Sequence, residues 1–154
     1  GQLISELDSL VDREPFYLDF YVKGKKLTVV NFHSRPHDKN PEGEIQAITN
    51  FLRTSPTGQP IILAGDFNVD QKEPVFEGIK GLGYNAAITS HRTTLKRACN
   101  GTDYLNYAID NIFYSNNITK MEGNAIDFVG VCDNLERART LSDHLPVFFE
   151  FRLQ

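Results

Sequence analysis

Two polar residues stand directly after a buried strand, and they are the first candidates for chemistry in this chain. Residues 61–64 form a continuous apolar run, which is typical of a strand covered on both faces. The run is followed at once by Gly65, Asp66, Phe67 and Asn68. Because strand side chains repeat every two residues, Asp66 and Asn68 are predicted to point to one rim, and Gly65 would allow a tight turn before them. Taken alone, the pair fits a polar turn equally well.

Three further strand ends carry an ionisable residue. His33 ends an apolar strand, Asp110 begins one, and Asp143-His144 comes immediately before the last strand. Taken singly, each also has an ordinary structural explanation, such as a turn or a satisfied strand-end histidine. Adjacent residues on an extended chain face opposite ways, so one of Asp143 and His144 could bind a metal ion while the other acts on a substrate. Since active sites of α/β sheets gather at strand ends and loops, four such ends predict one catalytic rim.

The elements that would position these residues alternate between helical and strand patterns. In the first half of the chain we expect a helix over 2–11, a hairpin of strands 16–22 and 27–33 joined by the turn 23–26, and a helix over 42–53. In the second half we expect a helix over 73–82, an irregular polar stretch over 84–105, strands over 107–114, 118–121, 125–129 and 147–153, and a short helix over 133–139. This order predicts an α/β layered domain, and 154 residues fit a single domain.

Composition and charge narrow the function classes. With 40% hydrophobic and 23% charged residues, the chain has the composition of a globular domain, and no apolar run approaches the roughly 20 residues of a membrane span. A net charge of −4 argues against nucleic-acid binding through a broad basic surface, but not against an enzyme that recruits metal cations and engages phosphate locally. The basic stretches 23–26 and 91–97 could meet a nucleic-acid backbone or a lipid headgroup, although solvated surface charge is the simpler interpretation.

The two cysteines, Cys99 and Cys132, lack the spacing of a metal site. They could pair in an oxidising compartment or stay unpaired as buried thiols. The sequence is compatible with both states.

Four short motifs together resemble the endonuclease/exonuclease/phosphatase superfamily. In chain order they are Asn31-Phe32-His33-Ser34, Gly65-Asp66-Phe67-Asn68, Ile109-Asp110-Asn111-Ile112 and Ser142-Asp143-His144. The superfamily includes pancreatic-type deoxyribonucleases, abasic-site endonucleases, neutral sphingomyelinases and inositol-polyphosphate phosphatases. Arg13, before the first hairpin, is similar to the arginine of another family strand. The resemblance implies a fold of two β-sheets packed face to face with helices outside, a four-layer α/β sandwich.

The resemblance also implies roles for the residues around the attacking water. Asp66 would orient or deprotonate that water, and Asn68 would hold a phosphate oxygen or a metal ligand. His144 would contact the phosphate and help to activate the water. Asp110 would accept a hydrogen bond from the far ring nitrogen of His144 and so fix its tautomer.

On the same grounds, Asp143 would bind a divalent cation together with Asp66 and Asn68, and the cation would be Mg²⁺ or Mn²⁺. His33 would act as a general acid near the leaving-group oxygen, and Arg13 would contact a substrate phosphate. The abasic-site endonucleases have a tyrosine where His33 falls. The histidine therefore favours the deoxyribonuclease-like or sphingomyelinase-like branches.

The chain is similar to only the C-terminal half of such a domain. An early asparagine and a metal-binding glutamate of the family have no counterpart, because Glu6 and Glu14 stand in unsuitable contexts. We therefore expect residues 1–154 to form one partial domain, with a mixed, largely antiparallel sheet and helices on one face. The apolar face left uncovered predicts association, either with a second copy or with the missing half.

The predicted function is metal-dependent hydrolysis of phosphodiester bonds, of the deoxyribonuclease kind, with nucleic acid (DNA) as the substrate. Activity of the isolated chain is expected to be weak. Two alternatives stay open. One is a phosphatase or a sphingomyelinase-like phospholipase of the same superfamily, and the other is a catalytically inactive binding module.

Overall fold

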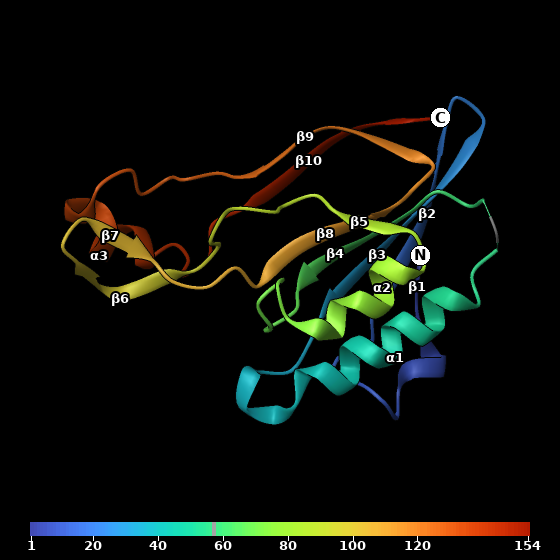
Figure 1. Cartoon of the computed structure of the whole chain (residues 1–154), viewed down its shortest axis with the longest axis horizontal. Helices are drawn as coiled ribbons and strands as arrows, with labels where there is room; N and C mark the ends of the chain where they lie inside the picture. Colours follow the sequence, from blue (N-terminus) through green and yellow to red (C-terminus); the bar gives the residue numbers. More distant parts are fainter. Residues whose placement is uncertain (57) are drawn as a thin grey trace.

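The fold is built around a six-stranded mixed sheet, which the computed structural model describes over residues 1–56 and 58–154. Its strands, in spatial order, are β1 (Gln2–Leu3), β2 (Phe16–Val22), β3 (Lys25–His33), β4 (Ile61–Asp66), β8 (Asp110–Ser115) and β5 (Tyr84–Ala86). The β3–β4 pair is parallel and the other four pairs are antiparallel. The prediction of a mixed, largely antiparallel α/β fold is therefore confirmed (Figure 1).

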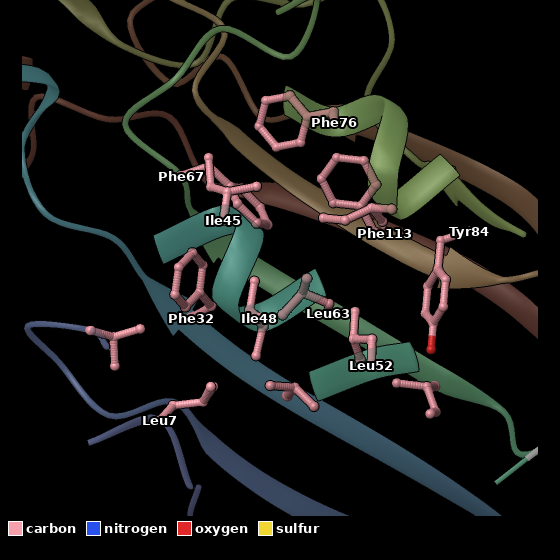
Figure 2. Close-up of a cluster of buried hydrophobic side chains, with 14 of the residues drawn as sticks. Leu7, Phe32, Ile45, Ile48, Leu52, Leu63, Phe67, Phe76, Tyr84 and Phe113 are labelled. Atoms are coloured by element: carbon pink, nitrogen blue, oxygen red, sulfur yellow. The ribbon is translucent and has the colours of Figure 1, made fainter. Parts of the chain in front are cut away.

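Helices cover one face of this sheet. They are α1 (Pro41–Arg53) and α2 (Glu77–Gly81), with 3₁₀ turns at Ser5–Leu7, His37–Lys39 and Pro74–Phe76. The α1 residues Ile45, Ile48 and Leu52 recur at helical spacing and are buried against the sheet, as predicted. Figure 2 shows the core that results, in which rings from strands and loops meet between the two helices.

The opposite face is covered in part by a separate ribbon of two antiparallel strands, β9 (Ile118–Ala125) and β10 (Val147–Leu153). Phe149 of this ribbon stacks on Tyr114 of β8, with ring centroids 4.7 Å apart. Beyond the ribbon, Phe20 and Val22 of β2 are 44% and 46% exposed. Together with residues of β3, β4 and β10 they line an open apolar groove of about 390 Å³.

A small lobe at one end of the molecule carries the remaining elements (Figure 1). It contains β6 (Leu95–Asn100), β7 (Asp103–Leu105), a 3₁₀ turn at Cys132–Asn134 and α3 (Leu135–Arg139). Its own core consists of Leu95, Val129, Leu135, Ala138 and Leu145. Of the two states left open for the cysteines, the structure has the disulfide, which joins Cys99 to Cys132.

Some predicted elements are wrong. The helix expected over 2–11 is instead β1 followed by a 3₁₀ turn, because Gln2 and Leu3 add an edge strand next to β2 and the Ile4 amide donates to the Pro15 carbonyl. The buried positions Ile4, Leu7 and Val11 mimic helical spacing.

Three boundaries in the second half of the chain also differ from the sequence prediction. The stretch 84–105 holds three strands, and β6 and β7 pair as a polar hairpin that packs against α3. The strand expected from 107 begins at Asp110. β9 runs from Ile118 to Ala125, longer than the strand expected over 118–121, and the second strand expected over 125–129 is wrong, because residues 126–129 lie outside any strand. Within the described ranges, no helix is both long and apolar enough to cross a membrane.

Candidate active site

Strand register places three of the predicted residues side by side at one edge of the sheet. His33 is the partner of Asp66 in the parallel β3–β4 pair, and Asp66 is the partner of Asp110 in the antiparallel β4–β8 pair. Strands β3 and β4 end at this edge, whereas β8 begins there. The convergence that the sequence predicted for these three strand ends is therefore present.

Gly65 permits the close approach of β3 and β4 behind this edge. It lies within β4, so the tight turn expected there is absent. A Cβ atom at position 65 would lie 1.6 Å from the carbonyl oxygen of Phe32. Only glycine can occupy such a position. Gly65 therefore sets the spacing between His33 and Asp66, although it has no side chain that could react.

One carboxylate oxygen of Asp66 faces two histidines. Its Oδ2 lies 3.7 Å from His33 Nε2 and 3.9 Å from His144 Nε2, and its Oδ1 accepts the Asn68 amide at 2.9 Å. Burial raises the pKa of Asp66, and the charge of Asp110 adds to the rise, while the Asn68 amide opposes it. A carboxylate whose pKa is raised by burial takes up a proton more readily than a free one, so Asp66 is a candidate proton acceptor.

His144 is held by Asp110. Its Nδ1 lies 2.9 Å from Asp110 Oδ2 and 3.1 Å from Oδ1. An ionised carboxylate only accepts hydrogen bonds, so Nδ1 carries the proton and Nε2 is directed toward Asp66. The hydrogen bond to Asp110 raises the pKa of His144 in spite of burial, and the charges of Asp66 and Asp143 act in the same direction.

Asn68 and Arg13 meet at one backbone carbonyl. Asn68 follows the end of β4 and has a left-handed backbone (φ 51°). The direction of its side chain is therefore not set by the alternation along a strand, contrary to the prediction. Its Nδ2 donates to the Ser34 carbonyl at 3.1 Å, and Arg13 Nη1 donates to the same oxygen at 3.1 Å. Both side chains are thereby fixed next to His33.

Asp143 lies outside the cluster formed by the other acids. Its side chain is exposed, and its backbone carbonyl accepts the Leu95 amide at 2.8 Å. Potential metal-ligand atoms of Asp66, Asp110 and His144 lie within 4.8 Å of one another. The structure thus brings these three together with His33, and leaves Asp143 at the margin as the neighbour of His144.

Two residues that support the site, Thr93 and Asn111, were not among the site residues predicted from the sequence. Thr93 is fully buried and donates to Asp110 Oδ2 at 2.6 Å. Asn111 is buried next to Asp110, and its side chain bonds the backbone of Ile88 and the side chain of Gln71. A polar residue inside a buried strand must find partners, so Asn111 could have been suspected. Thr93 lies in the stretch that was expected to be irregular.

The basic residues around the site are largely engaged in ion pairs. Arg92 Nη2 and Lys96 Nζ lie 2.7 and 2.6 Å from the carboxylate of Asp103. Their hydrogen bonds hold the pKa of Asp103 well below its usual range. Solvated surface charge is the simpler interpretation of the stretch 91–97, and it accounts for the side chains of Arg92 and Lys96.

The family assignment follows from the sequence of the whole chain. The model of the endonuclease/exonuclease/phosphatase family matches residues 6–144. The chain belongs to this family. Comparison with curated proteins gives no match.

Several solved structures share the fold at low sequence identity. A mannosyl-6-phosphatase from Bacteroides thetaiotaomicron is 19% identical, with a TM-score of 0.69 over 92% of this chain and 57% of that one. D. rerio TDP2 complexed with a single-strand DNA product is 15% identical, with a TM-score of 0.60 over 90% and 61%. Beta toxin from Staphylococcus aureus with bound magnesium ions is 18% identical, with a TM-score of 0.51 over 71% and 46%. The chain therefore spans about half to three fifths of each of these proteins.

The chemistry of the donor atoms suits a hard divalent cation. Carboxylate and carboxamide oxygens are the ligands that Mg²⁺ and Mn²⁺ prefer. Asp110 and His144 bond each other, which occupies the ring nitrogen and the carboxylate oxygen that face one another. Asp66 is the central acid of the cluster. Its Oδ1 accepts the backbone amide of Asn68, whereas its Oδ2 accepts no backbone hydrogen bond within the described part of the chain. The residues fit such a cation through Asp66.

Proposed function

We propose that this chain is part of a metal-dependent phosphodiesterase of the deoxyribonuclease kind, with DNA as the substrate. The observation that carries the proposal is the position of Asp66 Oδ2 between His33 Nε2 and His144 Nε2. Asp110 bonds Nδ1 on the other side of the His144 ring. This arrangement can take a proton from a water molecule on one side of a phosphate and supply one on the other. The TDP2 structure with a DNA product shows that a related fold accommodates single-strand DNA.

In this proposal the side chains share the tasks of the reaction. Asp66 and His144 Nε2 orient the attacking water, and Asp66, with its raised pKa, accepts the proton. His33, whose side chain is 51% exposed, reaches into solvent and donates a proton to the leaving oxygen. Asn68 and Arg13 lie at the Ser34 carbonyl and stabilise the charge on the phosphoryl oxygens.

A divalent cation would add electrostatic stabilisation of the developing phosphate charge. The residues that we propose to hold Mg²⁺ or Mn²⁺ are Asp66, Asn68 and Asp143. The geometric cluster of Asp66, Asp110 and His144 is the competing set. We favour the first set because Asp110 and His144 already bond each other, and in this proposal that pair orients the His144 ring toward the attacking water.

We further propose that residues 1–154 correspond to the C-terminal half of the relatives' domain, and that the other half supplies the missing metal-binding glutamate. The relatives are longer, since this chain covers 57% of the mannosyl-6-phosphatase. The apolar groove between β2 and β10 would be covered by strands of that other half. In its absence we expect two copies to associate through the groove.

Hydrolysis assays test the function. Supercoiled plasmid and bis(4-nitrophenyl) phosphate are incubated with Mg²⁺ or Mn²⁺ and either this chain or an N-terminally extended one. We expect cleavage by the extended protein and little by this chain, with Asp66→Ala and His144→Ala inactive. Glu122→Ala, an exposed acid on β9, is the control and should cleave normally. Plasmid left intact by the extended protein would overturn the nuclease proposal.

A phosphatase or phospholipase is the second candidate. The net charge of −4 and the pairing of Arg92 and Lys96 with Asp103 leave little basic surface for a long nucleic acid. Hydrolysis of a sugar phosphate, an inositol phosphate or sphingomyelin by the extended protein, with plasmid left intact, would favour this candidate. No hydrolysis of any substrate would favour a binding module.

The association is tested by light scattering. We expect this chain to run as a dimer at high concentration, and Phe20→Lys to shift it to the monomer. Tyr21→Lys is the control, because the neighbouring residue on β2 faces the other way and is already 73% exposed. A wild-type chain that stays monomeric at high concentration would contradict the proposal.

A further inference from the structure

Thr93 bonds Asp110 through its side chain and Leu145, the residue after His144, through its backbone. Its hydroxyl donates to Asp110 Oδ2 at 2.6 Å, and the same oxygen lies 2.9 Å from His144 Nδ1. The hydroxyl also accepts the Asp110 amide at 3.1 Å. Its backbone carbonyl accepts the Leu145 amide at 2.7 Å, directly beside His144. One residue therefore holds the start of β8 and the loop before β10, which are far apart in the sequence.

The contacts of Thr93 restrict how the Asp110 carboxylate can turn. A threonine is stiff at χ1, and the hydroxyl binds both the carboxylate and the backbone amide of one residue. Thr93 is 0% exposed, so water cannot replace the hydroxyl if it is removed. Without this bond, only the imidazole of His144 would remain to orient the carboxylate, and that ring is itself oriented by the carboxylate.

We propose that Thr93 is a positioning residue that fixes Asp110, and through Asp110 the ring tautomer of His144. This inference rests on the proposed function, because it takes the Asp110–His144 pair to serve hydrolysis. The orientation of the pair can be measured without any substrate. Thr93 touches none of the reacting atoms, so its effect should appear in the ring of His144 and in turnover, and hardly in substrate binding.

The tautomer of His144 is the decisive measurement. Two-bond ¹H–¹⁵N correlation spectra of the chain, recorded where the ring is neutral, distinguish Nδ1–H from Nε2–H. The His144 signals are assigned by their loss in His144→Gln. We expect Nδ1–H in the wild type and in Thr93→Ser, and a mixture with Nε2–H in Thr93→Val. Thr94→Val is the matched control, because Thr94 is also buried but bonds the backbone of Tyr107 rather than Asp110.

Turnover is the second readout. In the form of the protein that cleaves bis(4-nitrophenyl) phosphate, we expect Thr93→Val to lower kcat about 10- to 100-fold with KM nearly unchanged, the size of effect seen when a hydrogen bond that orients a functional histidine is lost. Thr93→Ser should restore most of kcat. Absence of hydrolysis in every form would count against the proposed function, while the tautomer measurement would still decide the role of Thr93.

Two results would overturn the proposal. One is a wild-type tautomer in Thr93→Val, which would show that Asp110 keeps its orientation without the hydroxyl. The other is an equal loss in Thr94→Val, which would show that any buried hydroxyl in this segment matters only for folding.

Discussion

Asp66 and Asp110 are direct partners across β4 and β8, so two carboxylates stand next to each other at one edge of the sheet. The charge of Asp110 adds to burial in raising the pKa of Asp66. Asp110 is compensated by His144 and Thr93, whereas Asp66 has only the Asn68 amide and two histidines beyond 3.5 Å. The charge of Asp66 is therefore compensated less well than that of Asp110, and its ionisation costs stability.

Replacing Asp66 with asparagine should stabilise the fold. The pKa of Asp66 is raised in the folded state, so its stabilising contribution is lost as pH rises through that pKa, and the ionised form is unfavourable at neutral pH. Asparagine keeps an acceptor for the Asn68 amide. We expect a higher urea midpoint at neutral pH in the presence of EDTA, and no change in Asp38→Asn, an exposed control. A lower midpoint in Asp66→Asn would contradict the argument.

The stability of the chain should also fall on the alkaline side of the histidine range. The pKa of His144 is raised above its ordinary 6.5 by the Asp110 hydrogen bond, and by the charges of Asp66 and Asp143. The stabilisation is fully present below 6.5 and is lost as pH rises through the folded-state pKa. Urea midpoints measured across this range should decline in the wild type and be flatter in His144→Gln. Parallel curves for the two proteins would rule this out.

Gly65→Ala should be among the most damaging small substitutions in the chain. The new methyl group would lie 1.6 Å from the Phe32 carbonyl oxygen, so β3 and β4 would have to separate. We expect a loss of about 3 kcal/mol or more in the free energy of unfolding, at the upper end of overpacking effects. Gly81→Ala at the end of α2, where nothing lies within 4 Å, should be neutral or stabilise by up to about 1 kcal/mol. Denaturant unfolding of both variants would test the contrast.

Phe67 couples the site to the core. It lies between Asp66 and Asn68, is fully buried, and has the rings of Phe32, Phe76 and Phe113 at centroid distances of 5.5, 5.5 and 5.2 Å. Phe67→Ala should reduce the free energy of unfolding by about 3–5 kcal/mol. The exposed Tyr21→Ala should change it by less than about 0.5 kcal/mol. Thermal and urea unfolding of the two variants would show whether Phe67 is as tightly packed as described.

The disulfide should stabilise the small lobe. Cys99, near the end of β6, and Cys132, at the 3₁₀ turn before α3, are 33 positions apart in sequence, and the segment between them contains β7, β8 and β9. We expect Cys99→Ser/Cys132→Ser to lower stability by about 2–4 kcal/mol. A reducing agent should lower the midpoint of the wild type and leave the double variant unaffected. Free thiols detected in the unreduced wild-type protein would contradict the pairing.

Several elements could be predicted from the sequence because their signals are local. Helix α1 shows 3.6-residue spacing in Ile45, Ile48 and Leu52, and strand β10 was predicted with its bounds, Val147–Leu153. The acids and histidines at strand ends were also recognisable, since a buried apolar run that stops at an ionisable residue can be seen without a fold. The sequence therefore singled out the candidate residues His33, Asp66, Asp110 and His144, which the structure brings to one edge of the sheet.

The tertiary structure decided which of these residues meet and what holds them. The register of β3, β4 and β8 sets His33, Asp66 and Asp110 in a row, and only that register shows that Gly65 allows the strands to approach. The N-terminal residues pair with β2 although their spacing is helical, because pairing at a sheet edge and burial outweigh a weak local preference. Thr93 joins Asp110 to His144 through contacts that no spacing in the sequence encodes. Local periodicity determines which faces are buried, whereas strand pairing and packing determine which distant side chains share a site.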